Sequence, residues 1–196
     1  MEVPLWNVRT LMEPSRLAQL ENEMDRLPIA IAGISEMRWS GKGATTTSQS
    51  NLVLHSGSSD GGRNGVGIYV SRKFKQTLIS WNPPVSDRII TARFRCNARH
   101  ITIVQCYAPT EDASDDIKDD FYNALISSLN KVIRGDIKIL MGDFNAKVGP
   151  NNTGLESTMG RHGIASSASV VRALNPLESI ASDRWTEAEE KLLEMY

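Results

Sequence analysis

Apolar residues along the first three-quarters of the chain fall into short runs of strand length, and two helical patterns separate these runs. Between Pro14 and Pro28 an apolar side chain recurs every three or four positions, which predicts an amphipathic helix. The same spacing returns over residues 117–132 and predicts a second helix. An acidic run at 111–120 leads into that helix, where acids complement the positive end of the helix dipole. Metal binding by this run is the alternative interpretation.

Strands are predicted where apolar residues run continuously or alternate, and Gly, Pro, Asn or Asp bound most of these runs. The predicted strands cover residues 3–8, 29–34, 52–55, 66–70, 89–95, 101–107 and 137–141. The chain order is therefore strand–helix–strand, then a meander, then helix–strand. This order predicts an α/β or α+β domain in which helices cover the outside of mixed sheets.

The pattern changes after Gly163. Residues 1–163 are predicted to form one domain, whereas residues 164–196 are rich in serine and small side chains at their start. Residues 184–193 then have the spacing of a capped helix. We interpret 164–196 as an unrelated tail with a terminal helix.

Composition narrows the class of protein. The chain has 196 residues, of which 40% are hydrophobic and 23% charged, as in a globular domain. The formal net charge of −1 argues against nucleic-acid binding by bulk charge and leaves a local patch as the alternative. The two cysteines, Cys96 and Cys106, fit neither a zinc pattern nor a disulfide framework, which favours a reducing compartment.

The sequence offers no membrane element. No stretch approaches the roughly 18 apolar residues that a membrane-spanning helix needs. The N-terminus has no basic region followed by an apolar core, so no signal peptide is predicted. The expected location is the nucleus or the cytoplasm, without a membrane partner.

Polar residues cluster where the predicted strands end. In layered α/β folds functional side chains gather at strand ends, because the sheet fixes the backbone while the side chains project beyond it. Four such clusters lie at or just after the ends of predicted strands: Trp6-Asn7-Val8-Arg9, Ser35-Glu36-Met37-Arg38-Trp39, Tyr107-Ala108-Pro109 and Gly142-Asp143-Phe144-Asn145. Their residue types are those that bind metal ions and phosphate groups.

These types match what the hydrolysis of a phosphodiester needs. Mg²⁺ and Mn²⁺ prefer carboxylate and carbonyl oxygens, which Glu36 can offer. Asp143 suits the activation of water, and Asn7, Asn145 and Tyr107 suit the positioning of a phosphate.

Each of these residues also has a purely structural interpretation. Asp143 and Asn145 could form a turn, and Glu36 could be an ordinary surface residue. Tyr107 could belong to the core, and Asn7 could be a cap or a strand residue.

Taken in order, the four clusters resemble successive motifs of the endonuclease/exonuclease/phosphatase superfamily. The subgroup they are most similar to comprises the endonuclease domains of RTE-type non-LTR retrotransposons and craniofacial development protein 2-like proteins. The phrases 6–11, 87–94 and 101–110 resemble this subgroup as well. The resemblance covers roughly residues 3–163.

The resemblance implies a four-layer α/β sandwich with two facing sheets and a metal site at one edge. It implies a hydrolase that uses Mg²⁺ or Mn²⁺ and nicks DNA. Glu36 is then the metal ligand, with Asn7 and Asp143 beside the metal. Tyr107 contacts the scissile phosphate, and Asp143 positions or activates water with Asn145 next to it.

The sequence departs from the family pattern at its end. The family's further strands and terminal Asp-His motif are not visible, so the domain is expected to be C-terminally truncated and its activity impaired. Loss of one electrostatic catalytic group costs about 10² to 10³ in rate. The alternatives are an inactive remnant, a module that binds nucleic acid or protein, and a hydrolase of phosphoinositides or other phosphomonoesters.

Overall fold

The computed structural model describes residues 3–59 and 64–145. Within these residues the chain forms nine strands and two α-helices. In chain order they are β1 Leu5–Asn7, α1 Pro14–Arg26, β2 Ile31–Ser35, β3 Lys42–Thr46, β4 Leu52–Ser56, β5 Val66–Val70, β6 Leu78–Ser86, β7 Ile89–Phe94, β8 Ile101–Tyr107, α2 Asp115–Asn130 and β9 Ile137–Asp143. The predicted tail 164–196 and the boundary at residue 163 lie outside the described residues.

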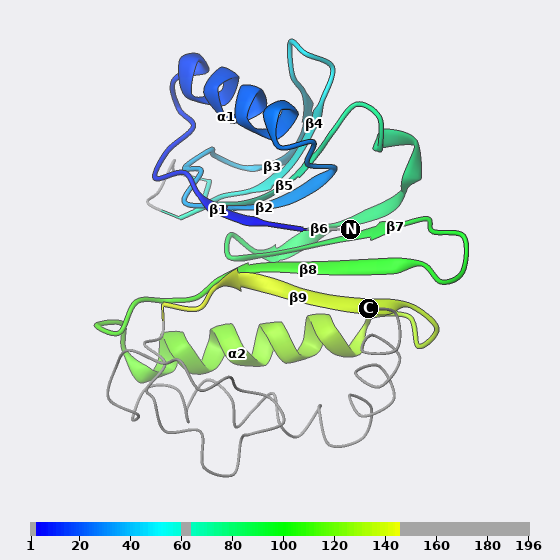
Figure 1. Ribbon diagram of the computed structural model, residues 1–196. Coiled ribbons are helices and arrows are strands. Elements are labelled where there is room, and N and C mark those ends of the chain that lie inside the picture. The colour runs from blue at the N-terminus through cyan, green and yellow to red at the C-terminus, as the bar shows by residue number, and fades with distance from the viewer. Residues whose placement is uncertain (1–2, 60–63, 146–196) are drawn as a thin grey trace, which may run out of the picture.

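The strands form two sheets that face each other, and each sheet carries a helix on its outer face (Figure 1). The first sheet has the order β1-β2-β5-β4-β3 and is covered by α1. The second sheet has the order β6-β7-β8-β9 and is covered by α2. This arrangement is the predicted four-layer α/β sandwich, which is thereby confirmed.

Apolar side chains fill all three spaces between the layers. On β8, Ile103 faces the first sheet whereas Val104 faces α2, as the period of two in a strand requires. Helix α1 begins at Pro14, a residue suited to the first helical turn, and buries Leu20 and Met24. The hydrophobic effect therefore stabilises every layer against its neighbour.

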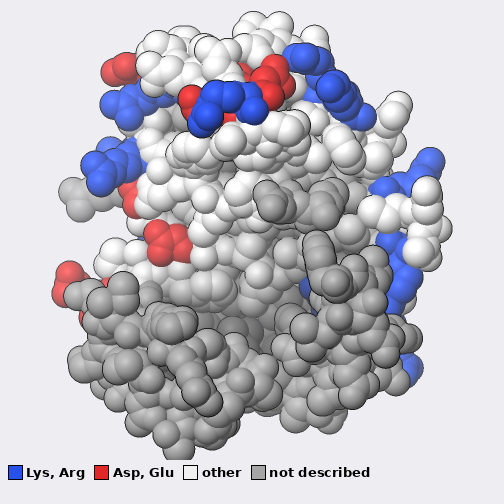
Figure 2. Space-filling view, in the orientation of Figure 1, with Lys and Arg blue, Asp and Glu red and all other residues white. Residues whose placement is uncertain are grey.

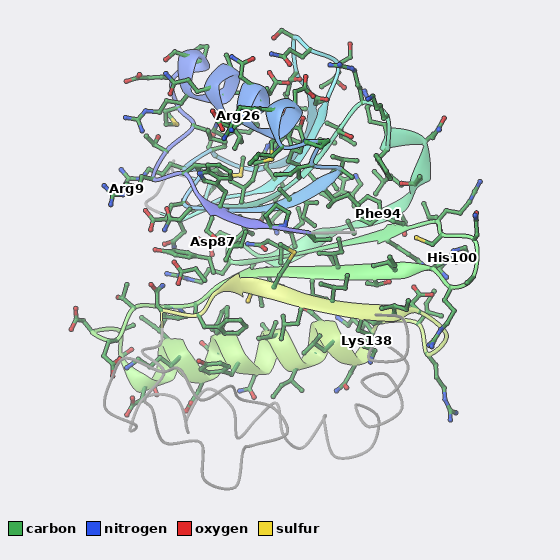
Figure 3. All side chains as sticks on the ribbon, viewed as in Figure 1. Arg9, Arg26, Asp87, Phe94, His100 and Lys138 are labelled. Atoms are coloured by element: carbon green, nitrogen blue, oxygen red, sulfur yellow. The ribbon has the colours of Figure 1, made fainter. Side chains whose placement is uncertain are left out.

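Two parallel strand pairs place the ends of several strands at one edge of the sandwich. Strands β1 and β2 pair in parallel and are connected by α1, and strands β8 and β9 pair in parallel and are connected by α2. The registers put Asn7 beside Ser35 in the first sheet and Tyr107 beside Asp143 in the second. In Figure 3 the labelled residues Arg9 and Asp87 lie at this edge, and His100 and Lys138 lie at the opposite end of the sandwich.

Strands β3 and β6 were not predicted from the sequence, and both lie at the edge of a sheet. Strand β3 contains lysine, glycine and threonine, is largely exposed, and gains its strand conformation by pairing with β4. Strand β6 contains Pro83 and Pro84, which cannot donate ladder hydrogen bonds and are tolerated at an edge. Neither segment has the apolar alternation on which strand prediction depends.

The acidic run is the start of a helix, as predicted. Asp115 and Asp116 occupy the first turn of α2. Among the described residues, no group of three or more His, Cys, Asp or Glu side chains is placed to hold a metal ion, so the alternative of metal binding by this run has no support. No helix in the described part of the chain is long and apolar enough to span a membrane.

Candidate active site

Two side chains, from the ends of two strands, converge on the carboxylate of Glu36. Asn7 is the last residue of β1, Glu36 comes directly after β2, and Tyr107 is the last residue of β8. The side-chain nitrogen Nδ2 of Asn7 donates a hydrogen bond to Oε1 of Glu36 at 2.7 Å. The phenol of Tyr107 donates to the same oxygen at 3.4 Å. The first sheet and the second sheet therefore meet at Glu36.

The orientation of the Asn7 amide is fixed by the backbone. Its oxygen Oδ1 accepts a hydrogen bond from the backbone N–H of Arg9 at 3.0 Å, so its nitrogen must face Glu36. This geometry makes Asn7 a residue that holds the carboxylate. The nitrogen of the amide, rather than its oxygen, is the atom that reaches the expected metal ligand.

Asp143 and Asn145 lie where β9 ends, next to the end of β8. Oδ1 of Asp143 accepts from the backbone N–H of Asn145 at 2.9 Å, which is the turn geometry that the sequence left open. Nδ2 of Asn145 donates to the carbonyl oxygen of Ala108 at 2.6 Å. A Cβ at Gly142 would lie 2.2 Å from the carbonyl oxygen of Cys106, so only glycine fits before Asp143. The turn and the site residue are the same feature.

Four non-glycine residues around this edge have left-handed backbone conformations. The φ angles are 56° at Arg9, 57° at Glu36, 61° at Arg38 and 48° at Asn145. Such conformations cost on the order of 1–3 kcal/mol each and concentrate at functional sites. Two of the four belong to the predicted site, Glu36 and Asn145, and the other two are close neighbours in sequence.

Tyr107 links the two halves of the site electrostatically. Its side chain is buried at the inner face of the second sheet, and burial together with the nearby Glu36 raises the pKa of the phenol. A hydrogen bond with Asn145 lowers this pKa, Asp143 raises it, and Arg88 lowers it. The phenol therefore stays protonated at neutral pH and acts as a hydrogen-bond donor.

Arg88 is a residue of this edge that sequence reasoning missed. Its Cζ atom lies 5.6 Å from the centre of the Tyr107 ring, within cation–π range. Its Nη1 donates to the carbonyl oxygens of Tyr107 and Ala108, at 3.3 Å each. Residues 87–94 resemble the family subgroup, which is a signal for Arg88 in the sequence. Nothing in the sequence pointed to its contact with Tyr107.

The carboxylates of Glu36 and Asp143 are the candidate ligands for a divalent cation, and the described residues place no third His, Cys, Asp or Glu side chain with them. Neither Glu36 nor Asp143 forms an ion pair within the described residues. Both carboxylates act electrostatically on Tyr107, and Arg88 is the cation that acts on the same phenol. In the described part of the chain no hydrogen bond reaches Oε2 of Glu36. Carboxylate oxygens are what Mg²⁺ and Mn²⁺ prefer. The residues present are therefore compatible with the expected metal.

Fold and site together define a class of protein. The four-layer sandwich is the fold that the sequence motifs implied, and Asn7, Glu36, Tyr107 and Asp143 lie at one edge of it. The Endonuclease/Exonuclease/phosphatase family matches residues 5–187, and the chain belongs to this family. Its fold is that of nucleases, phosphodiesterases and phosphatases.

Among curated proteins, craniofacial development protein 2 from Bos taurus is 35% identical over 159 residues. This match covers 81% of the chain and 26% of the relative. The same protein from Tragulus javanicus is also 35% identical, over 81% of the chain and 27% of the relative. The chain thus spans about a quarter of the length of the curated relatives it matches.

Solved structures share the fold at low sequence identity. The endonuclease domain of TRAS1, a telomere-specific non-LTR retrotransposon, matches with a TM-score of 0.53 and 22% identity, over 74% of this chain and 58% of that one. TDP2 of D. rerio, complexed with a single-strand DNA product, matches with a TM-score of 0.53 and 11% identity, over 78% of this chain and 63% of that one. At these identities the likeness concerns the fold alone.

Proposed function

We propose that this chain is a divalent-metal-dependent phosphodiesterase that cuts DNA, descended from the endonuclease of a non-LTR retrotransposon. The observation that carries the proposal is the convergence of Asn7 and Tyr107 on one oxygen of Glu36. A carboxylate held from two sheets at a strand-end edge is suited to binding a metal beside a phosphate.

The metal would be Mg²⁺ or Mn²⁺, held by Glu36 through the oxygen that Asn7 and Tyr107 leave open. Asp143 is the second carboxylate at this edge, and Asn7 contributes by orienting Glu36. When bound, the cation supplies positive charge that stabilises the developing negative charge on the phosphate oxygens.

The chain's own residues then divide the remaining work. Asp143 has one oxygen fixed by the Asn145 backbone, which leaves the other to orient a water molecule and accept its proton. Tyr107 is protonated, so its phenol can donate to a phosphate oxygen. Asn145 and Arg88 both donate hydrogen bonds to the carbonyl oxygen of Ala108 and thereby fix the turn after Tyr107.

DNA is the proposed substrate because two compared proteins point to it by name, one a retrotransposon endonuclease and one crystallised with single-strand DNA product. Charge shapes how DNA would be held. On the described part of the face in Figure 2, Lys and Arg form separate groups rather than one continuous basic surface. Local contacts at the site edge, including the exposed Arg9 and Arg38, are therefore proposed to hold the phosphate backbone.

The test is a nicking assay on supercoiled plasmid with Mg²⁺. We expect the wild-type chain to convert supercoiled to open-circular DNA and EDTA to abolish the conversion. Asp143→Asn should lower kcat by about 10² to 10⁴, because it removes the proton acceptor. Glu36→Gln should lower the affinity for Mg²⁺, measured as the metal concentration that gives half-maximal rate.

The matched control is Asp119→Asn, which removes an exposed carboxylate on α2 and should leave the rate unchanged. Folded wild-type protein that binds DNA without nicking it would favour the alternative of a nucleic-acid-binding module. Release of phosphate from lipid headgroups without nicking would instead favour a phosphomonoesterase.

A further inference from the structure

Gln105 is a buried amide in the apolar space between the two sheets. It lies on β8 between Ile103 and Tyr107, which face this space, and its side chain is fully buried. Burying an amide among apolar groups is unfavourable unless its hydrogen bonds are made. Gln105 is two residues before Tyr107 and therefore on the same face of β8 as this site residue.

The side chain of Gln105 reaches from the second sheet to the first. Nε2 lies within hydrogen-bond distance of Oγ of Ser35 at 3.2 Å and of the carbonyl oxygen of Ile34 at 3.4 Å. A third acceptor is the carbonyl oxygen of Cys106 at 3.3 Å. Ser35 is the last residue of β2 and immediately precedes Glu36. The amide thus connects the end of the strand that carries Glu36 to the strand that carries Tyr107.

Gly33 on β2 leaves room for this amide because it has no side chain. A Cβ at Gly33 would lie 2.2 Å from Oε1 of Gln105 and 2.5 Å from Cε of Met141. The lack of a side chain at Gly33 therefore lets Gln105 and Met141 pack against β2. Oε1 itself is buried and has no hydrogen-bond partner among the described residues.

An unpaired buried acceptor lowers stability, so the amide is a poor choice for packing alone. An unbranched apolar residue of similar length would fill the same space without an unpaired oxygen. The hydrogen bonds of its nitrogen explain the amide better. These bonds go to Ile34 and Ser35, the two residues immediately before Glu36.

We propose that Gln105 is a positioning residue that sets the distance between Glu36 and Tyr107 by tying β8 to the end of β2. This inference rests on the proposed function, in which Glu36 and Tyr107 act at one phosphate. Without the tie, the two sheets stay packed by their apolar side chains, but the two strand ends are free to shift relative to each other. A displacement of about 1 Å in such a site can cost on the order of 10²-fold in rate.

The experiment compares Gln105→Met with Ser35→Ala, which removes the acceptor instead of the donor. The matched control is Ile103→Val, on the same face of β8 and farther from the site. Three quantities are measured: the urea midpoint of unfolding, kcat and KM for plasmid nicking, and the ¹³Cζ NMR resonance of Tyr107. The chain has four tyrosines, so Tyr107→Phe assigns this resonance by its disappearance.

We expect Gln105→Met to keep or raise the urea midpoint, lower kcat by about 10²-fold and leave KM unchanged. The Tyr107 resonance should shift, because the phenol loses its geometry against Glu36. Ser35→Ala should shift the resonance in the same direction. Ile103→Val should lower the midpoint and leave both kcat and the resonance at their wild-type values.

An unshifted Tyr107 resonance in folded Gln105→Met and Ser35→Ala would overturn the proposal. A fall in kcat that merely follows the midpoint in all three variants would overturn it as well, because that is the behaviour of a packing residue. The resonance needs no catalysis. If wild-type protein does not nick DNA, the proposed function fails while the resonance still decides the role of Gln105.

Discussion

Adjacent residues on β8 have opposite surroundings, and their chemistry differs accordingly. Tyr107 lies in the space between the sheets at the candidate site, whereas Cys106 faces α2. Burial and the negative charge of Asp143 raise the pKa of the Cys106 thiol to about 12. Because the thiolate is the reactive form, Cys106 is inert at neutral pH although it neighbours a site residue.

Thiol labelling should therefore distinguish the two free cysteines. Iodoacetamide at pH 8 is expected to modify Cys96, which is partly exposed, and to leave Cys106 unmodified in folded protein. Mass spectrometry of peptides measures both sites. In urea both should react, and Cys96→Ser should abolish labelling of the folded chain at these two sites. Labelling of Cys106 before unfolding would contradict the buried position of its thiol.

At the scale of elements, an ion pair clamps the second sheet at the end far from the site. Arg93 on β7 donates to both oxygens of Asp136, at 2.7 and 2.9 Å, and Thr102 on β8 donates to the same carboxylate at 2.6 Å. Asp136 directly precedes β9 and is 6% exposed. The hydrogen bond from Arg93 is the main cause that lowers the pKa of Asp136.

Asp136→Asn should lower the free energy of unfolding at neutral pH, because it leaves the Arg93 guanidinium without its bidentate partner. A lowered pKa in the folded state stabilises the fold above the ordinary Asp pKa of about 3.9, and this contribution is lost as the pH falls through the lowered value. The difference between wild type and variant should be constant from pH 8 to about 5 and shrink below about pH 4.

Urea titrations at each pH measure this difference. Asp25→Asn is the matched control, since Asp25 pairs with Arg72 at 3.4 Å and both side chains are more than two-fifths exposed. Exposed pairs contribute about 0–1 kcal/mol, so the control should change little. A difference that grows as the pH falls would have the wrong sign for a carboxylate with a lowered pKa.

At the scale of the whole molecule, the residues of the candidate site meet because two sheets pack against each other. Asn7 ends a strand of the first sheet and Glu36 directly follows another, whereas Tyr107 and Asp143 end strands of the second sheet. Gly33 allows the approach, because any side chain there would meet Gln105 and Met141.

Gly33→Ala should therefore destabilise the fold by about 1–3 kcal/mol, the usual cost of overpacking a core. It should also reduce nicking, because it displaces the Gln105 amide. Gly135→Ala is the control of identical chemistry, since a Cβ there meets no atom within 4 Å. Thermal unfolding and the plasmid assay measure both effects. Equal stability of the two variants would show that the side chains of Gln105 and Met141 can move aside without loss.

Much of the architecture was predictable from local sequence. The helix between Pro14 and Pro28 and the strands around 66–70 and 101–107 were predicted at nearly their observed positions, because apolar periodicity reports which face is buried. Strands β3 and β6 were missed, since edge strands are defined by pairing with a neighbour rather than by their own pattern. The roles proposed for the site residues stay predictions.

The sequence by itself determined the two helices, most of the strands, the strand ends that carry Glu36, Tyr107 and Asp143, and the family, because periodicity and short motifs are local properties. Only the tertiary structure decided that Asn7 turns its nitrogen toward Glu36 and that Arg88 lies over Tyr107. It alone brought the Gln105 amide across to Ser35. Contacts of this kind join residues tens of positions apart, and the packing of one sheet on another, which no local pattern encodes, creates them.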